Sequence, residues 1–187
     1  LPHRINYRAN IAALAELSPV AVIAVGSVGG ITPRCPTGSI VLPDQLIDYT
    51  WGRSSTFSDD EEVWHVDFTF PFDQGVRREL LHAAAMVNES LVDGAVYAVT
   101  QGPRLETAAE IQRLAKDGAD IVGMTAMPEA VLAREKQLPY ALLSPVINAA
   151  AGIEASADGI AVDSLTDQVT MMGNRIVSVI QTFIERA

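Results

Sequence analysis

Cysteine and histidine are scarce in this sequence, and their scarcity argues against two common kinds of site. The 187 residues include a single cysteine, Cys35, so no disulfide can form within the chain, and a reducing, cytoplasmic location is expected. Cys35 lies in a turn-like stretch between two prolines with no adjacent histidine, which favours a packing or surface thiol over a nucleophile. The histidines, His3, His65 and His82, do not follow the spacing of metal ligands, so we expect no metal site.

Positive charge and long hydrophobic runs are also missing. Lys and Arg total 13 against 23 Asp and Glu, which gives a net charge of −10. Because proteins bind nucleic-acid polymers by neutralising phosphates with Lys and Arg, this composition argues against such a partner, although one small anion can still bind in a local electropositive pocket. The longest apolar segments, such as Val20–Val25 and Ala95–Val99, are far too short to cross a bilayer, and no secretory signal is visible. We therefore expect neither a nucleic-acid nor a membrane partner.

Apolar residues, by contrast, are abundant. At 49% apolar and 19% charged, the chain predicts one globular domain over residues 1–187. Apolar β-rich runs alternate with helical patterns and lack strict alternation, which predicts an α/β sandwich whose parallel or mixed sheet is buried on both faces. The expected strands are Val20–Val25, Ser39–Leu42, Ala95–Thr100, Ile121–Gly123 and Tyr140–Ile147, and the expected helices are Asn6–Leu17, Gly75–Glu89, Thr107–Lys116, Pro128–Glu135 and Asp163–Glu185.

Two of the predicted helices begin with clear local signals. Thr107 and Glu110 form a capping box, in which a hydroxyl and a carboxylate each satisfy a free backbone amide. Pro128 suits the first position of a helix, and Glu129 in the first turn complements the helix dipole. The polar segment Trp51–Glu62, by contrast, predicts a long surface loop, for which a binding lid or partner contact and simple disorder are equally compatible interpretations.

Clusters of glycine and polar residues follow several of the predicted strands, and ligands bind at this end of the strands in open α/β sheets. In Val25–Gly30, successive backbone amides can form an anion-binding nest, although a tight turn is the favoured interpretation of this cluster taken alone. In Gln101–Thr107, the carboxylate of Glu106 either accepts a ring N–H from a base or simply favours the helix dipole, and the two interpretations have equal weight.

Two further clusters occupy equivalent positions. In Gly123–Glu129, Thr125 places a hydroxyl and a backbone amide near the positive end of a helix, which suits phosphate. Met124 in the same cluster either packs on a sugar or belongs to the core. In Ser144–Gly152, the amide of Asn148 ends an apolar strand and either binds a ligand or caps the loop that follows. Each cluster is a weak signal by itself.

In their order and identity, these clusters resemble the trimeric purine nucleoside and methylthioadenosine phosphorylase family. The resemblance covers nearly the whole chain and implies a three-layer α/β sandwich with a central mixed, partly barrel-like sheet. It also implies phosphorolysis, in which inorganic phosphate attacks the anomeric carbon of a nucleoside and releases a purine and a ribose 1-phosphate without any cofactor. The matching string is Tyr97–Gly152, which includes Gly102–Glu110 and Val122–Glu135. Upstream, the methylthio-nucleoside branch is matched by Asn6–Asn10, Val28–Gly30 and Asp44–Thr50.

The resemblance also implies roles for individual residues. Asn148 matches the catalytic residue that hydrogen-bonds the purine at N7 and its six-position, and Glu106 matches the glutamate that receives N1–H of 6-oxopurines. An amide donor aimed at the departing purine stabilises the negative charge that develops there only in the transition state. The remaining matches are Met124 and Tyr7 at the ribose, Leu105, Ala149 and Ala150 at the substrate, Thr125 and the Ser27 backbone at the phosphate, Val162 near the 5′ end, and His65, lent to the neighbouring subunit of a homotrimer.

Glu106 and Asn148 together indicate which purine is bound. A 6-oxopurine presents N1–H and O6 and so satisfies one acceptor and one donor, whereas adenine would place the N1 lone pair against the carboxylate. Val162 falls near the position where inosine phosphorylases have a histidine for the 5′-hydroxyl, and an apolar valine suits a methylthio group better. We therefore expect S-methyl-5′-thioinosine to be preferred, with methylthioadenosine or inosine as other substrates of the same reaction.

The sequence departs from the family at its beginning. The chain opens at Leu1, after the point where the family has a glycine-rich loop and an Arg-His motif that bind phosphate, and Gly26 and Ser27 stand where relatives often have Asn or Thr followed by Ala. If residues 1–187 are the whole protein, we expect phosphate affinity to fall severely. The alternative to the enzyme is therefore a catalytically impaired protein on the same scaffold that binds purines or other planar aromatic ligands.

Overall fold

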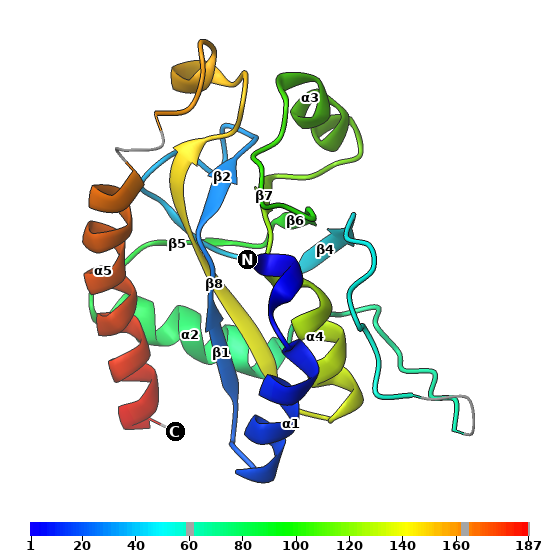
Figure 1. Cartoon of the computed structure of the whole chain (residues 1–187). Coiled ribbons are helices and arrows are strands. Elements are labelled where there is room, and N and C mark those ends of the chain that lie inside the picture. Colours follow the sequence, from blue (N-terminus) through cyan, green and yellow to red (C-terminus); the bar gives the residue numbers. More distant parts are fainter. Residues whose placement is uncertain (59–61, 162–164, 187) are drawn as a thin grey trace.

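The central feature of the fold is a mixed sheet (Figure 1). The computed structural model describes residues 1–58, 62–161 and 165–186. Within them the eight-stranded sheet has the order β4-β6-β7-β2-β8-β3-β5, and β1 also pairs with β8. The strands are β1 (Val22–Val25), β2 (Val28–Gly30), β3 (Ile40–Leu42), β4 (Gln45–Asp48), β5 (Leu91–Asp93), β6 (Val96–Val99), β7 (Ile121–Gly123) and β8 (Tyr140–Ala149). The helices are α1 (Tyr7–Glu16), α2 (Gln74–Met86), α3 (Ala108–Lys116), α4 (Ala126–Glu135) and α5 (Leu165–Arg186), with short 3-10 helices at Pro2–Arg4 and Glu154–Ser156.

Strand β8, which is 10 residues long, organises this sheet. β1 and β2 pair with it in parallel, one after the other along its length, whereas β3 pairs with it antiparallel at Ser144 and Pro145. β2 and β7 are antiparallel, and the pairs β4–β6, β6–β7 and β3–β5 are parallel. The expected mixed sheet of an α/β protein is therefore confirmed.

Helices cover both faces of the sheet, and successive side chains of β8 pack alternately against the helices on one face and the helices on the other. Ala141 and Leu143 pack with α2 and α5, whereas Tyr140 and Leu142 pack with α1 and α4 on the opposite face. Successive side chains of a strand point to opposite faces, so an uninterrupted apolar run is what a strand covered on both sides requires. β8 is therefore buried on both faces as expected, whereas β1, β4 and β5 are only partly buried.

Three strands of the structure were absent from the sequence prediction. They are β2, β4 and β5, each only three or four residues long. β2 contains two glycines, Gly29 and Gly30, and owes its extended conformation to its neighbours β7 and β8 rather than to its own propensity. β4 and β5 are likewise held by parallel partners that are distant in the sequence, which no local pattern reveals.

The predicted start of α3 is confirmed, whereas the assigned start of α4 differs from the prediction by two residues. The capping box of α3 is confirmed, because the Thr107 hydroxyl accepts from the Glu110 amide and the Glu110 carboxylate accepts from the Thr107 amide. In α4 the assigned helix begins at Ala126, two residues before Pro128. Met127, however, has an extended backbone (φ −115°, ψ 138°), as expected for a residue that precedes proline, so the regular part of α4 does begin at Pro128.

The segment predicted as a surface loop, Trp51–Glu62, is anchored within residues 51–58. The Thr56 hydroxyl and the Phe57 amide each donate to the carboxylate of Glu135 on α4, at 2.6 Å in both cases. Residues 59–61 lie outside the described ranges. Among the helices that are described, none is long and apolar enough to span a bilayer.

Candidate functional site

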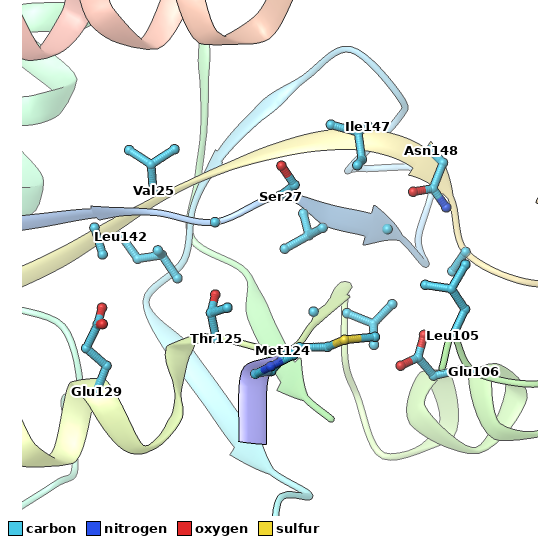
Figure 2. Close-up of a pocket in the computed structure, with 18 of the residues that line it drawn as sticks. Val25, Ser27, Leu105, Glu106, Met124, Thr125, Glu129, Leu142, Ile147 and Asn148 are labelled. Carbon is cyan, nitrogen blue, oxygen red and sulfur yellow. The ribbon is translucent and has the colours of Figure 1, made fainter. Parts of the chain in front are cut away.

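A cavity of about 540 Å³ opens where β1, β2, β7 and β8 meet the first turns of α1 and α4. Its wall is completed by the turn that follows β6. Figure 2 shows its length: Glu129 and Val25 lie toward one end, Glu106 and Asn148 toward the other, and Met124 lies between them. Ligand sites in α/β proteins are expected at such a meeting of strand ends.

Parallel pairing of β6 with β7 brings two of the lining turns together. Because Val99 pairs with Gly123, both strands end at the same level, and the turns that carry Glu106 and Thr125 leave the sheet side by side. Gly102 in the first turn has φ +62° and lies so close to the Met124 side chain that a Cβ there would collide with the thioether. Glycine is therefore required at this position on both conformational and steric grounds.

Glu106 faces the cavity instead of serving the helix that follows it. Its Oε1 accepts a hydrogen bond from the Thr100 hydroxyl at 2.6 Å, whereas capping of α3 is performed by Thr107 and Glu110. The same carboxylate also borders a second cavity, of about 340 Å³, on the far side of the turn. A carboxylate held in this way keeps acceptor capacity on its other oxygen, Oε2.

Asn148 lies near the end of β8, opposite Gly29 of β2. Its Nδ2 donates to the carbonyl oxygen of Ala149 at 2.7 Å, and the Ser156 hydroxyl donates to that same oxygen at 2.7 Å. An amide nitrogen carries two N–H groups, so the side chain is fixed by one of them and retains a second donor. Ala149 is buried and is not among the residues that line the cavity, whereas Ala150 does line it.

Thr125 and Gly26 approach each other across the cavity wall. A Cβ at Gly26 would lie only 2.8 Å from Oγ1 of Thr125, so the hydroxyl occupies space that any other residue at position 26 would need. Thr125 is the N-cap residue of α4, but its side chain makes no capping hydrogen bond. The hydroxyl is therefore not used in capping, and it lines the cavity together with the small residues Gly26 and Ser27, which form a short connection between β1 and β2.

Glu129 is a cavity residue that the sequence interpretation treated only as a partner of the helix dipole. It lies four residues after Thr125, at the start of the regular part of α4, and its Oε1 accepts a hydrogen bond from the Tyr140 hydroxyl at 2.8 Å. Burial raises the pKa of the Glu129 carboxyl, an effect that the Tyr140 hydrogen bond partly offsets. Burial also raises the pKa of Tyr7, whereas the nearby Arg53 guanidinium lowers it.

The remaining predicted residues divide into those that the cavity brings together and those that it does not. Tyr7, Ser27, Leu105, Glu106, Met124, Thr125, Asn148 and Ala150 all line it. His65 is exposed and is not part of the cavity wall, and Val162 lies outside the described residues. The functional roles of all these residues remain predictions.

The charge of the cavity is negative. The described residues that line it include the carboxyls of Glu106 and Glu129 but no Lys, Arg or His. Across the described part of the chain, no group of three or more His, Cys, Asp or Glu side chains is arranged to hold a metal ion. Any anion in the cavity must therefore rely on hydroxyls, backbone amides and the N-terminal end of α4.

Comparison with known proteins gives a consistent result. The family model described as the phosphorylase superfamily matches residues 1–185. A protein named probable S-methyl-5′-thioinosine phosphorylase from Xylella fastidiosa (strain 9a5c) is 54% identical over 175 residues, which cover 92% of this chain and 74% of that protein. The 6-oxopurine nucleoside phosphorylase of Pyrococcus furiosus is 46% identical over 159 residues, covering 81% of this chain and 60% of that protein.

Solved structures agree with the sequence relatives. Methylthioadenosine phosphorylase from Schistosoma mansoni in complex with adenine superposes with a TM-score of 0.91 at 26% identity, covering 98% of this chain and 71% of the other. The expected nucleoside phosphorylase fold is thereby confirmed. A second Xylella fastidiosa relative (strain Temecula1), of the same name as the first, is 57% identical over 84% of this chain, which spans 64% of that relative's length.

Proposed function

The chain belongs to the phosphorylase superfamily, and from this premise we propose that its cavity serves the phosphorolysis of a 5′-methylthio purine nucleoside. S-methyl-5′-thioinosine is the preferred substrate, and methylthioadenosine and inosine are weaker ones. A phosphate oxygen forms a bond to C1′ while the C1′–N9 bond breaks, its electron pair leaves with the purine, and the purine takes up a proton. The products are the free purine and 5-methylthioribose 1-phosphate, as in purine and methylthio salvage, and the reaction consumes no cofactor.

The observation that carries this proposal is the meeting of Glu106 and Asn148 at one end of the cavity. An ionised Glu106 accepts N1–H of a 6-oxopurine through the oxygen that Thr100 leaves free. In this proposal the second N–H of Asn148 donates to N7 or O6, where negative charge grows as the glycosidic bond breaks, and the lining of the cavity by Asn148 supports this role. A donor that is fixed before the reaction lowers the barrier because it need not reorganise in the transition state.

Beyond the base, the cavity offers surfaces for the sugar and the phosphate. Met124 lies along its middle, with Tyr7 also in its wall, and these two supply apolar and hydroxyl contacts to the ribose. Thr125, at the start of α4, presents a hydroxyl that is not used in capping, and Ser27 lies on the opposite strand connection. Hydroxyls and amides at the positive end of a helix suit inorganic phosphate, the co-substrate.

An apolar rim favours a methylthio group at the 5′ position. Ile5, Val25 and Ile160 line the cavity, and both Ile5 and Val25 are still substantially exposed, at 41% and 51%. A methylthio group covers such surface with a gain of roughly 25 cal/mol per Å² buried, whereas a 5′-hydroxyl would lose hydrogen bonds to water. Ile160 belongs to the same segment as Val162, the residue that we assign to this end of the substrate.

We also propose a homotrimer and a cytoplasmic location. The exposure of His65 supports the first, since an exposed residue outside its own cavity is free to reach that of a neighbouring subunit. Cys35 is a buried free thiol, which suits a reducing compartment.

A second candidate function follows from the charge of the cavity. Because no cationic side chain is found among the described lining residues, the cavity offers more specific contacts to a purine than to a phosphate. The second candidate is therefore a protein that binds purines or other planar aromatic ligands without phosphorolysis.

Base release and base binding separate the two candidates. The chain is incubated with methylthioinosine, methylthioadenosine and inosine, with and without inorganic phosphate, and free base is measured by chromatography. Phosphate-dependent release that is fastest from methylthioinosine supports the enzyme. Calorimetric binding of hypoxanthine without any release supports the binding protein, and absence of both contradicts both proposals. Asn148→Ala prepared in parallel reports any phosphorylase carried over from the expression host.

A further inference from the structure

We propose that Arg53 is the positioning residue that holds the two site turns, those of Glu106 and Thr125, in register with each other. The inference rests on the proposed function and deepens it. Arg53 comes from the segment that the sequence predicts as a surface loop, and it does not line the cavity. Its side chain lies behind the cavity wall, where it contacts the backbone of both turns.

Four carbonyl oxygens converge on this one guanidinium. Nη1 donates to the carbonyl oxygens of Met124 and Met127, at 2.8 and 2.5 Å. Nη2 donates to the carbonyl oxygens of Thr100 and Gln101, at 3.3 and 2.9 Å. Met124 belongs to the turn between β7 and α4 and Met127 to the irregular start of α4, whereas the second pair belongs to the turn between β6 and α3. One planar group thus bridges the two turns that carry the predicted substrate contacts.

The same side chain reaches a third segment of the wall. Its Nη1 lies 3.4 Å from the Tyr7 hydroxyl, and its Cζ lies 5.7 Å from the centre of the Tyr7 ring, which is the geometry of a cation–π contact. Its Nε donates to Oε1 of Gln101 at 3.2 Å. Tyr7 is one of the predicted ribose contacts, so Arg53 contacts three of the segments that form the cavity wall.

The carbonyl oxygens of the two turns need several hydrogen-bond donors at one point, and a guanidinium supplies them. The carbonyl oxygens of Thr100, Gln101, Met124 and Met127 lie beyond the last paired residues of β6 and β7, Val99 and Gly123, so the β6–β7 ladder supplies no donors for them. Within the described residues, no carboxylate lies within ion-pair distance of Arg53, so its donors serve these four carbonyl oxygens, the Gln101 side chain and the Tyr7 hydroxyl. Without them, the oxygens would be left buried or would turn toward water and carry the turns apart.

Only arginine has the right shape for this position. Its five N–H donors lie in one plane in a fixed fork, whereas the three donors of a lysine ammonium radiate from one nitrogen and are too few for the four carbonyl oxygens. The loop that presents Arg53 is itself fixed, since Thr56 and Phe57 are bound to Glu135. The guanidinium is therefore delivered by an anchored segment and not by a mobile one.

The test compares Arg53→Lys, Arg53→Ala and the control Arg34→Ala. Arg34 also donates to a backbone carbonyl, that of Gly94 at 2.8 Å, but lies outside the cavity wall. We expect hypoxanthine binding by calorimetry to weaken at least tenfold in both Arg53 variants and to remain unchanged in Arg34→Ala. Added guanidinium ion, at concentrations far below those that unfold proteins, should restore part of the affinity of Arg53→Ala but not of Arg53→Lys.

A merely structural role would give another result. In that case the melting temperature falls in the Arg53 variants while the folded fraction binds hypoxanthine normally, and that outcome overturns the proposal. If Arg53→Ala does not fold, Arg53→Lys alone decides between weakened and normal binding.

Hydrogen exchange tests the positioning role of Arg53 even if the proposed function is wrong. Should the unaltered chain neither bind nor release a purine, the proposed function fails, but exchange of residues 99–107 and 122–129 still measures the coupling between the turns. We expect both segments to exchange faster together in Arg53→Lys than in Arg34→Ala. Unchanged exchange in either segment overturns the positioning role.

Discussion

The hydroxyl of Thr100 lies 2.6 Å from Oε1 of Glu106. The two residues stand on either side of the turn after β6, so the strand end orients the carboxylate that the following turn carries. The Thr100 hydroxyl fixes the orientation of this carboxylate, which accepts N1–H of a 6-oxopurine and disfavours the N1 lone pair of adenine. Discrimination between the two bases therefore depends on Thr100 as well as on Glu106.

Thr100→Val tests this dependence because it removes the hydroxyl while keeping the shape of the side chain. We expect the ratio of kcat/KM for methylthioinosine over methylthioadenosine to fall about tenfold, the equivalent of about 1.5 kcal/mol for a hydrogen bond to a charged group. Thr100→Ser keeps the hydroxyl and should keep most of the ratio, whereas Glu106→Gln should relax discrimination further. If neither Thr100→Val nor Glu106→Gln changes this kcat/KM ratio, the Glu106 carboxylate does not discriminate between the two bases.

Asn148→Ala removes the amide donor at the base end. Loss of one preorganised donor to the developing negative charge typically lowers kcat by about 100- to 1,000-fold, and we expect a loss in this range with a smaller change in KM. The expected pattern follows because the donor matters most when charge accumulates on the departing purine. Steady-state kinetics with methylthioinosine at saturating phosphate provides the measurement. A variant that loses affinity but keeps its kcat would assign Asn148 to binding alone.

Gly26→Ala places a methyl group 2.8 Å from Oγ1 of Thr125, closer than real Cβ atoms come to other atoms. The hydroxyl must move, so we expect KM for phosphate to rise about tenfold, equivalent to about 1.4 kcal/mol, while hypoxanthine binding is retained. Gly173→Ala in α5 is the matched control, since a Cβ there meets no atom within 4 Å. It should leave KM unchanged and stabilise the fold by about 0.5–1 kcal/mol. Equal phosphate KM values for the two variants would exclude Thr125 from phosphate binding.

The sequence predicts the long elements of the fold well and the short ones poorly. β8 and the helices can be predicted from apolar runs, capping residues and proline, all of which are local features of the sequence. β2, β4 and β5 have no such signal, because their few residues become strands only when partners distant in the chain come alongside. The residue clusters at the strand ends were visible in advance since they follow strands that were predicted.

What the sequence did not reveal about the site comes from long-range packing. Arg53 is separated from its partners Met124 and Met127 by 71 and 74 residues, and nothing in the polar segment around it distinguishes it from a solvent-exposed arginine. Glu129 was assigned to the helix dipole because its position in the first turn is a local feature, whereas its hydrogen bond from Tyr140 depends on how α4 packs against β8. Both residues become visible only when the sheet brings the turns together.

Glu129 gives the last prediction, which concerns the stability of the fold at different pH values. Burial raises the pKa of this carboxyl above its usual value of 4.5, so the folded chain binds the proton more tightly than the unfolded chain does. Stability must then decrease as the pH rises from about 4.5 through the raised pKa, and the full penalty applies above it. The nearby hydroxyls of Tyr7 and Tyr140 do not titrate in this range, because their pKa values are raised from 10.0.

Glu129→Gln removes the charge while keeping an oxygen that can accept from Tyr140. At neutral pH we expect the variant to be more stable than the original chain by on the order of 1 kcal/mol, or about 2–4 °C in Tm for a chain of this size. The gain should shrink as the pH is lowered toward 4.5, because the original carboxyl then becomes protonated and neutral as well. Thermal unfolding of both proteins across this pH range measures the difference directly, and effects of other titrating groups cancel in the comparison. A gain that is the same at every pH would show that it arises from packing and not from the buried charge.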